Sequence, residues 1–420
     1  MNEIFVEKFG GASINDAKSL RNVVEILEKE DKKRVIVFSA MGKTTNSLES
    51  LINDFYSSKQ INFSILSLIK DFHFNICNEL IKDKAGLNEL EELFNLIPKL
   101  LKENTNSDYN RLYDSIVVFG ELISTKIISL YFDSISFSHK LLDARELIHT
   151  NSKFRNADID WEMTNHEINK EISKYINQYN TIITQGFIGS DYNNHSTTLG
   201  REGSDFSAAI LAHCLDAKSM TIWKDVPGLL NADPKKFANT IKFDSIPFRS
   251  AIELSYYGAS IIHPKTIKPL ENKNIPLYVK SFLDYNSPGT IICKCDEINP
   301  LVPSYIFKDN QVLVSITPKD FSFIAESNIS HIFSLFDKNG IKINLMQNSA
   351  LSFSVCFDEN GGLSKLIDEL RIEYRVKYNQ GLRLITIRHY KEEEISKLIE
   401  NKEVLIEQRS RITAQYLINN

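Results

Sequence analysis

The chain has 420 residues, of which 42% are hydrophobic and 25% charged, and its formal net charge is -5 at pH 7. This length and composition predict two or three folded domains and exclude a disordered or fibrous protein. The small negative charge provides no field for holding nucleic acid or an anionic membrane, so neither partner is expected.

Five cysteines are scattered along the chain, and only Cys293 and Cys295 lie close together. This set is not typical of a secreted disulfide framework, and the close pair lacks the second Cys or His pair that a zinc site needs. The first ten residues contain no basic segment followed by an apolar one, and no apolar run approaches about 18 residues. We therefore expect a cytoplasmic protein with no metal site of its own and no membrane span.

Strand-like and helix-like segments alternate along the first two thirds of the chain. Buried strands are predicted at residues 4–9, 34–40, 181–185, 220–223 and 277–279. Helices are predicted at residues 16–29, over most of 47–132, and at 204–215. Such alternation predicts an α/β fold in which helices cover a mainly parallel sheet.

The pattern changes near residue 297, after the turn-forming stretch Asn286-Ser287-Pro288-Gly289. The order that follows is strand 312–316, helix 327–337, strands 341–346 and 351–357, and helix 363–370. This β-α-β-β-α order predicts a ferredoxin-like βαββαβ unit at about 305–375, and residues 376–420 would form a second, shortened unit. We place the domains at 1–296 and 297–420.

The stretch Lys8-Phe9-Gly10-Gly11 leaves the first strand and precedes a helix, where unpaired backbone N–H groups can face an anion. The two glycines allow close approach, and the lysine supplies a point charge for phosphate oxygens. The loop matches neither a Walker A motif nor a GxGxxG fingerprint. Taken alone, it is more typical of an ordinary tight turn beside a surface lysine.

Residues 197–209, TTLGREGSDFSAA, combine hydroxyls, glycines, a guanidinium and a carboxylate just before an apolar helix. Arg201 offers a planar fork suited to a carboxylate, and Ser204 or Asp205 can cap the helix or position a phosphate acceptor. The alternative is a helix cap followed by a solvated arginine.

A second polar stretch, residues 223–235, begins where a strand ends in Lys224-Asp225, which is where ligands of open α/β sheets bind. Lys235 could reach a nucleotide phosphate or lie in solvent. Glu121 lies within a predicted helix at 110–132 among apolar residues, so it is either an exposed helix glutamate or a buried carboxylate that an ammonium group would satisfy. His263 before Pro264 reads as a structural residue at a helix start.

No HExxH, GxSxG or protein-kinase HRD and DFG set is present, which disfavours those enzyme classes. Taken in this order, the four stretches resemble the aspartate kinases of the amino-acid kinase family, from Lys8 to about residue 295. The tail resembles the ACT regulatory region of the same family. The resemblance implies an amino-acid kinase type three-layer αβα sandwich followed by a ferredoxin-like ACT region.

The resemblance also implies roles for particular residues, with Lys8 and Asp205 as the catalytic pair. Residues implied to bind ATP are Lys8, Phe9, Gly10, Gly11, Lys224, Asp225, Leu230 and Lys235. Residues implied to bind the substrate are Ser39, Thr45, Glu121, Arg201 and Ser204. Within this scheme Arg201 clamps the α-carboxylate of L-aspartate and Glu121 takes its α-ammonium.

The implied reaction transfers the γ-phosphate of ATP to the side-chain carboxylate of L-aspartate and yields 4-phospho-L-aspartate and ADP, the first step toward lysine, threonine and methionine. ATP and Mg²⁺ are the implied cofactors, and the metal is carried by ATP. ACT pairing implies a homodimer with lysine or threonine as a possible effector. Two alternatives stay open: a catalytically silent ACT-type amino-acid sensor, and a kinase for another amino acid such as glutamate or acetylglutamate.

Four positions depart from the family pattern. Ala12 replaces a common threonine, and Ser260 stands where some relatives have a nucleotide-contacting lysine. Glu202 replaces a glycine and is expected to pair with Arg201 or a nearby lysine, or, if unpaired, to weaken nucleotide binding. Asn344 stands where lysine-inhibited relatives can carry aspartate, and its amide cannot supply a carboxylate to an effector ammonium.

Overall fold

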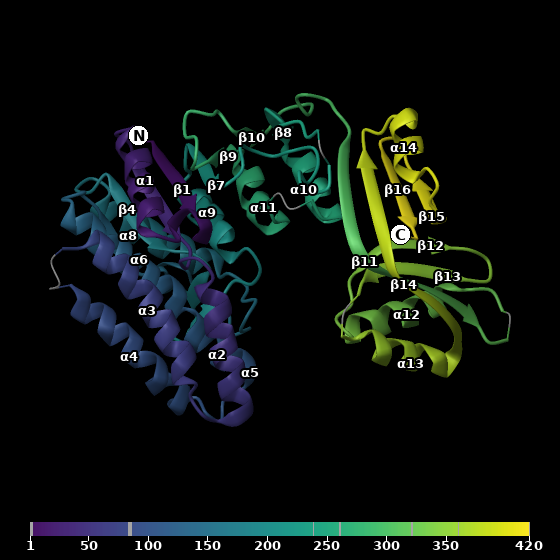
Figure 1. Ribbon diagram of the computed structural model, residues 1–420, viewed down its shortest axis with the longest axis horizontal. Helices are drawn as coiled ribbons and strands as arrows, with labels where there is room; N and C mark the ends of the chain where they lie inside the picture. The colour runs from purple at the N-terminus through teal and green to yellow at the C-terminus, as the bar shows by residue number, and fades with distance from the viewer. Residues whose placement is uncertain are drawn as a thin grey trace. The chain divides into compact units, whose positions relative to one another are not determined.

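A computed structural model of the protein describes residues 3–82, 86–237, 239–259, 262–320, 322–359 and 361–419. The chain forms two compact units (Figure 1). The first contains Met1–Leu229, Lys242–Ile252 and Ile261–Pro300, and the second contains Leu230–Ile241, Glu253–Ser260 and Leu301–Asn420. Two short segments that the sequence placed in the first domain therefore belong to the second unit. They do so because they pack there: the Phe237 ring stacks on Tyr305, and Glu253 forms an ion pair with Arg388.

An eight-stranded sheet forms the centre of the first unit, in the order β3-β4-β2-β1-β7-β9-β10-β8. Its strands are β1 Ile4–Phe9, β2 Lys33–Phe38, β3 Lys140–Leu142, β4 Thr181–Gln185, β7 Ser219–Lys224, β8 Ser245–Pro247, β9 Leu277–Ser281 and β10 Thr290–Cys293. Every pair in it is parallel except β9 with β10. The mainly parallel sheet predicted from the sequence is confirmed. A short hairpin of β5 Ile188–Ser190 and β6 Ser196–Thr198 follows β4.

Helices cover both faces of this sheet, as the alternating pattern predicted. They are α1 Ala17–Glu28, α2 Thr44–Ser58, α3 Phe63–Leu80, α4 Leu87–Glu103, α5 Tyr109–Val117, α6 Phe119–Ser134, α7 Ala144–Leu147, α8 Trp161–Tyr175, α9 Gly203–Cys214, α10 Phe248–Tyr257 and α11 Pro264–Lys273. The side chains of Phe9, Ile36 and Phe38 pack with α1 to α6. On the other face, α9 contacts β1, β2 and β7 and is itself covered by α8 and α11.

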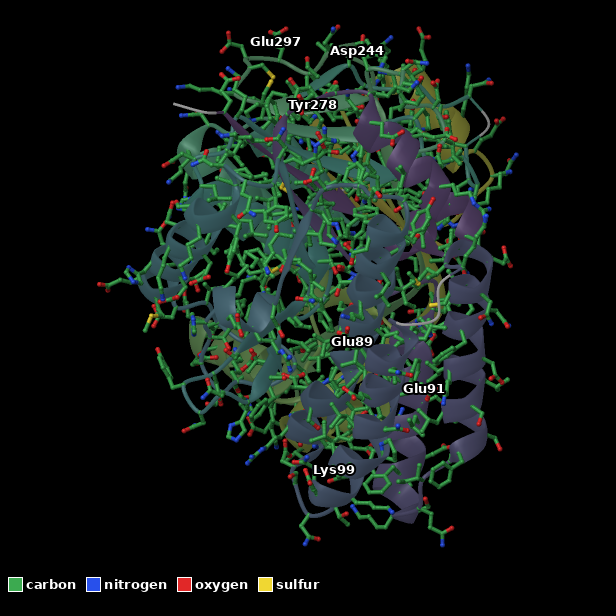
Figure 2. The ribbon with its side chains drawn as sticks, turned by 90° about the vertical axis from the view of Figure 1, so that its left-hand side faces the viewer. Glu89, Glu91, Lys99, Asp244, Tyr278 and Glu297 are labelled. Carbon is green, nitrogen blue, oxygen red and sulfur yellow. The ribbon has the colours of Figure 1, made fainter. Side chains whose placement is uncertain are left out.

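Capping and amphipathic spacing explain where these helices form. An Asp or Asn side chain accepts a hydrogen bond from the backbone at the start of α1, α3, α5 and α8, through Asp16, Asn62, Asp108 and Asp160. The helix α4 buries Leu90, Phe94, Ile97 and Leu101. Its charged residues Glu89, Glu91 and Lys99 lie on the outer side (Figure 2).

The predicted helix at 110–132 is two helices, α5 and α6, that meet at Val118. At this join the N–H of Glu121 reaches back only three residues, to the carbonyl of Val118. The stretch Tyr109–Ser134 is long and apolar enough to cross a membrane, but 83% of its most apolar window is buried inside the protein. It is therefore a core helix pair.

The second unit is built on a six-stranded antiparallel sheet in the order β12-β13-β11-β14-β16-β15. Its elements are β11 Ser304–Pro318, α12 Glu326–Lys338, β12 Ile343–Asn348, β13 Phe353–Asp358, α13 Leu363–Glu373, β14 Tyr374–Arg388, α14 Glu392–Ile399, β15 Val404–Arg409 and β16 Thr413–Ile418. The run from β11 to β14 has the predicted β-α-β-β-α-β order. Its core lies between the strands and the helices α12 and α13.

The shortened second copy obtains its fourth strand from an earlier part of the chain. The first half of β11 pairs with the second half of β14, with Tyr305 opposite Ile387 and Phe307 opposite Ile385. One helix, α14, covers this half of the sheet through Ile395, and the segment 230–241 packs beside it in the same core. Counting the residues after 376 could not reveal a strand contributed from before 310.

Candidate active site

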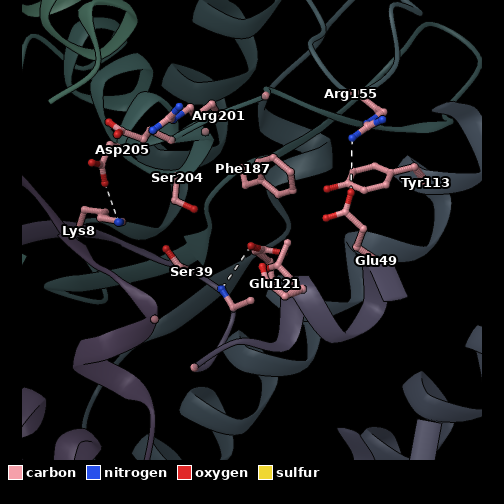
Figure 3. A pocket seen from close by; sticks show the side chains of 18 residues that line it. Lys8, Ser39, Glu49, Tyr113, Glu121, Arg155, Phe187, Arg201, Ser204 and Asp205 are labelled. Atoms are coloured by element: carbon pink, nitrogen blue, oxygen red, sulfur yellow. Dashed lines mark hydrogen bonds and ion pairs between the residues drawn. The ribbon is translucent and has the colours of Figure 1, made fainter. Parts of the chain in front are cut away.

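One pocket gathers most of the side chains that the sequence singled out. It has a volume of about 470 Å³ and lies at the carboxyl ends of β1, β2 and β4, beside the first turns of α2 and α9 (Figure 3). The predicted residues that line it are Lys8, Gly11, Ser39, Thr45, Glu121, Arg201, Ser204 and Asp205. Carboxyl ends of parallel strands are where open α/β sheets bind ligands, and the site follows that rule.

Lys8 and Asp205 form an ion pair inside the pocket. The Lys8 ammonium lies 2.6 Å from Asp205 Oδ1, and the two side chains are only 11% and 6% exposed. Lys8 alternates with the buried Phe9 along β1, so its side chain points to the α9 side of the sheet. Asp205 lies in the first turn of α9, where the helix dipole favours a carboxylate. The pair therefore holds a cation at the end of β1.

The glycine turn after β1 depends on a close approach between two loops. A Cβ on Gly11 would lie 2.8 Å from the carbonyl oxygen of Ala40 and 2.9 Å from that of Gly42, so no larger residue fits without moving the backbone. The Phe9 ring is buried and stacks on Phe38 and Trp223. Its side chain is thus part of the core, and its implied contact with ATP stays a prediction for the backbone alone.

Glu121 is a carboxylate buried at the pocket wall. Its Oε1 accepts a hydrogen bond from the Ala40 N–H at 3.3 Å, and within the described part of the chain Oε2 has no hydrogen-bond partner. Burial raises the pKa of Glu121 to about 8, and the Ala40 hydrogen bond and the Lys8 charge lower it only partly. The sequence was consistent with either an exposed or a buried Glu121 side chain, and in the structure the side chain is buried. A buried oxygen that faces a pocket and has no partner is suited to a ligand ammonium.

Arg201 lies at the opposite side of the pocket from the Glu121 wall (Figure 3). Its guanidinium makes no hydrogen bond or ion pair with any residue between 3 and 419 that the structure describes. It is therefore available to donate hydrogen bonds to a ligand carboxylate. The left-handed backbone of Gly200, with φ at 79°, turns the chain just before it. The loop before α9 therefore presents an exposed cation at the pocket.

Among the residues that the structure describes, Glu202 forms no ion pair with Arg201 or with a lysine, contrary to the sequence expectation. Its Oε2 accepts a hydrogen bond from the His263 N–H at 2.9 Å, at the start of α11. The helix dipole stabilises a carboxylate there. The extra charge is thereby drawn toward α11. His263 is the N-cap of α11 and accepts a hydrogen bond from the Lys265 N–H, as its structural reading predicted.

Several residues implied to bind the nucleotide do not line this pocket. Lys224 and Asp225 lie at the end of β7 in the first unit. Leu230 and Lys235 belong to the second unit. Gly10 precedes the pocket residue Gly11 in the turn after β1. Their implied roles stay predictions, and Ser260 lies outside the described residues.

Some pocket residues were not identified from the sequence, among them Glu49, Tyr113, Arg155 and Phe187. The Arg155 guanidinium lies 4.4 Å from the centre of the Tyr113 ring and 3.5 Å from Glu49. Glu49 is one helical turn after Thr45, which is the one local signal that could have suggested it. Arg155 lies in an irregular segment with no such signal, since only the tertiary fold brings it to the pocket.

The pocket has no cage of side chains for a metal. No group of three or more His, Cys, Asp or Glu residues able to hold an ion occurs within the described ranges. Mg²⁺ commonly binds through one or two carboxylates together with substrate phosphates. The pocket is lined by carboxylates, among them Glu49 and Asp205, of the kind that such an ion uses.

Comparison with known proteins agrees with this fold. Residues 3–281 match the model of the amino acid kinase family. The chain is 30% identical to lysine-sensitive aspartokinase 3 of Escherichia coli (strain K12) over 399 residues, which cover 92% of this chain and 87% of that protein.

Two solved structures of Escherichia coli aspartokinase III, each 27% identical to this chain, are similar over 99% of it. The complex with aspartate and ADP has a TM-score of 0.84 and is covered to 96%, and the complex with lysine and aspartate has a TM-score of 0.82 and is covered to 95%. By the family match and by this kinship, the chain belongs to the amino acid kinase family, and within it to the aspartokinases.

Proposed function

We propose that this chain is an ATP-dependent aspartate kinase, which transfers the γ-phosphate of ATP to the side-chain carboxylate of L-aspartate and makes 4-phospho-L-aspartate and ADP. One observation carries the proposal: the pocket holds a buried carboxylate oxygen of Glu121 without a partner and an available guanidinium of Arg201. This pair recognises the ammonium and the α-carboxylate of a free amino acid. The product is the first intermediate toward lysine, threonine and methionine.

The reaction needs alignment and charge neutralisation more than proton transfer. The side-chain carboxylate of aspartate has a pKa near 3.9 and is already an anion at neutral pH, so no general base is required. One of its oxygens forms a bond to the γ-phosphorus while the bond from that phosphorus to the bridging oxygen of ADP breaks. Mg²⁺ carried by ATP would supply part of the positive charge that the phosphates need.

Lys8 supplies positive charge from the protein itself. Its ammonium is held 2.6 Å from Asp205 and is almost fully buried, so it costs little reorganisation when the phosphoryl group moves. The turn at Gly11 brings backbone close to the same place. We assign to Lys8 the contact with the transferring phosphoryl group and to Asp205 the orientation of Lys8.

Hydroxylamine trapping of the acyl phosphate, measured together with ADP release, tests the proposal. We expect a hydroxamate with L-aspartate and only background with glutamate or N-acetylglutamate, because the latter lacks the ammonium that Glu121 would bind. Lys8→Ala and Arg201→Ala should each lower kcat/KM at least about 100-fold. ATP turnover without any hydroxamate would favour another acceptor, and no ATP turnover at all would favour an amino-acid sensor. Unchanged kcat/KM in both variants would contradict the site assignment.

We further propose a cytoplasmic homodimer that pairs through its second unit and responds to an amino acid. The proposal draws support from the β-α-β-β-α-β architecture of that unit and from the lysine bound in an aspartokinase III structure. In this chain Asn344 Oδ1 accepts a hydrogen bond from Lys308 Nζ at 2.7 Å, and its amide nitrogen donates to Gln311. Kinase assays with lysine or threonine added separately, sedimentation with and without each, and cell fractionation test these points.

A further inference from the structure

We infer that Asp114, a residue of α5 behind the pocket wall, is a positioning residue that sets Arg201 and Arg155 for binding of the amino-acid substrate. The inference rests on the proposed function. Asp114 does not line the pocket, so it acts through the two segments that its carboxylate joins. No sequence pattern singles it out.

The Asp114 carboxylate accepts three hydrogen bonds from two separate segments. Its Oδ2 accepts from the Arg155 N–H and from the Thr198 N–H, each at 2.9 Å, and its Oδ1 accepts from the Thr198 hydroxyl at 2.8 Å. The side chain is completely buried. One carboxylate thus ties α5 to the segment before α8 and to the strand β6 that leads into the Arg201 loop.

The two segments also contact each other, so the three-way junction behaves as one piece. The Ala157 N–H donates to the Thr198 carbonyl at 2.9 Å. A Cβ on Gly200 would lie 2.7 Å from the Asn156 side-chain oxygen, which shows how closely the two backbones approach. Arg201 follows Gly200 directly. Thr198 is only three residues before Arg201, so a shift of Thr198 also displaces Arg201.

The Arg155 end of the junction is held in an uncommon conformation. Arg155 has a φ of 67°, in the left-handed region that non-glycine residues rarely adopt. Its N–H is the atom bonded to Asp114, and its guanidinium lies over Tyr113 and beside Glu49 at the pocket. The hydrogen bond that the Arg155 N–H donates to Asp114 thus offsets the cost of this conformation and keeps Arg155 at the pocket.

Burying a carboxylate costs free energy, so its presence at this buried position indicates a specific role. Burial raises the pKa of Asp114 to about 6, while its hydrogen bonds to Arg155 and Thr198 and the Arg155 charge act in the opposite direction. Charged and titratable groups that act on it or feel its charge include Arg155 and Tyr113. The carboxylate provides two oxygens that together accept hydrogen bonds from three donors. An asparagine side chain has only one oxygen that can accept them.

Steady-state kinetics of Asp114→Asn and Asp114→Ala test the inference in the full chain. We expect the KM for L-aspartate to rise about tenfold in the alanine variant and less in the asparagine variant, which keeps one acceptor, while kcat and the KM for ATP change less than about twofold. Thr198→Val removes only the hydroxyl contact and should reproduce part of the effect. The matched control is Ile116→Ala, an equally buried residue of α5 in the hydrophobic core, which should lower the melting temperature without this selective KM change.

Amide hydrogen exchange separates failure of this inference from failure of the proposed function. In Asp114→Ala the amides of Arg155 and Thr198 should exchange faster than in the Ile116→Ala control, and this holds whatever the substrate is. If the wild-type protein showed no activity with aspartate, the proposed function would be wrong, but the exchange test of the Asp114 contacts would still apply. Equal KM values for aspartate in wild type and both Asp114 variants, or a KM change that Ile116→Ala shares, would overturn the positioning role.

Discussion

Glu121 is a buried acidic residue whose second oxygen is placed to bind a ligand rather than another protein group. The residue follows the join of α5 and α6, which places it against the loop after β2. One oxygen is satisfied by Ala40 and the other has no hydrogen bond in the described structure. Leaving such an atom unsatisfied costs about 1–3 kcal/mol, a cost that a bound ammonium removes.

The pH dependence of aspartate use follows from this residue. Because burial raises the pKa of Glu121 to about 8, its carboxyl group is mostly protonated at pH 7 in the free enzyme and binds an ammonium weakly. We expect kcat/KM for aspartate to rise about fivefold between pH 7 and pH 8, as for a single ionising group of that pKa. In Glu121→Gln the value should be low and should lose this rise. A wild-type profile that is flat over this interval would contradict the assignment.

The same residue affects stability in a direction that can be worked out. The folded chain keeps the Glu121 proton up to about pH 8, whereas the unfolded chain releases it near the ordinary value of 4.5. The contribution of Glu121 to stability is therefore fully present below about pH 4.5 and is lost as the pH rises through about 8. Glu121→Gln should raise the melting temperature at pH 8 and leave it nearly unchanged at pH 4.5. An equal shift at both pH values would contradict the buried-carboxyl account.

At the scale of elements, the site depends on how closely the loops after β1 and β2 approach. Gly11→Ala would place a methyl group 2.8 Å from the Ala40 carbonyl, so the two loops must separate. We expect a loss of about 1–3 kcal/mol in the free energy of unfolding and a larger loss in kcat/KM, because Lys8 and Glu121 lie on either side of this contact. Denaturant titration and kinetics measure both.

Gly361→Ala is the matched control for that substitution. Gly361 lies in the second unit, has no positive φ and has nothing within 4 Å of an added Cβ. The same chemical change there should leave stability within about 0.5 kcal/mol and activity unchanged. If Gly11→Ala behaved like this control, the close approach of the two loops would not matter to the site.

The second unit depends on a segment that lies far from it in the sequence. Phe237 stacks on Tyr305 with ring centroids 4.6 Å apart and helps to cover the half of the sheet that has only α14. We expect Phe237→Ala to destabilise this unit by about 2–4 kcal/mol. Phe323→Ala, at a ring that is 72% exposed in the same unit, should cost much less. Hydrogen exchange of β14 and β16 in the two variants measures the difference.

At the scale of the whole molecule, the sequence predicted what depends on local patterns. Alternating apolar segments fixed the parallel sheet and its helices, and the stretches around Lys8 and Arg201 identified the pocket. Arg155 and Asp114 could not be predicted, because their roles arise from contacts between segments about 40 to 80 residues apart. The partner predicted for Glu202 was wrong for the same reason, because its actual partner, His263, is 61 residues away in the sequence.

The two units also show why domain boundaries were only partly predictable. A boundary read from turn residues near 297 assumes that each domain is one continuous piece of chain. Residues 230–241 lie inside the first domain by sequence, yet their apolar side chains complete the core of the second unit. The strand order of that unit likewise uses residues from both ends of the region.

The central claim is that a side-chain oxygen of L-aspartate attacks the γ-phosphorus of ATP in this pocket. L-Aspartate labelled with ¹⁸O in its side-chain carboxylate tests it directly, with hydroxylamine added to cleave the acyl phosphate at carbon. Because the bridging oxygen then leaves with phosphorus, we predict that the released phosphate carries one ¹⁸O in its ³¹P NMR spectrum, and that Arg201→Ala abolishes the signal. Phosphate without ¹⁸O, formed at the same rate when aspartate is omitted, would contradict the account.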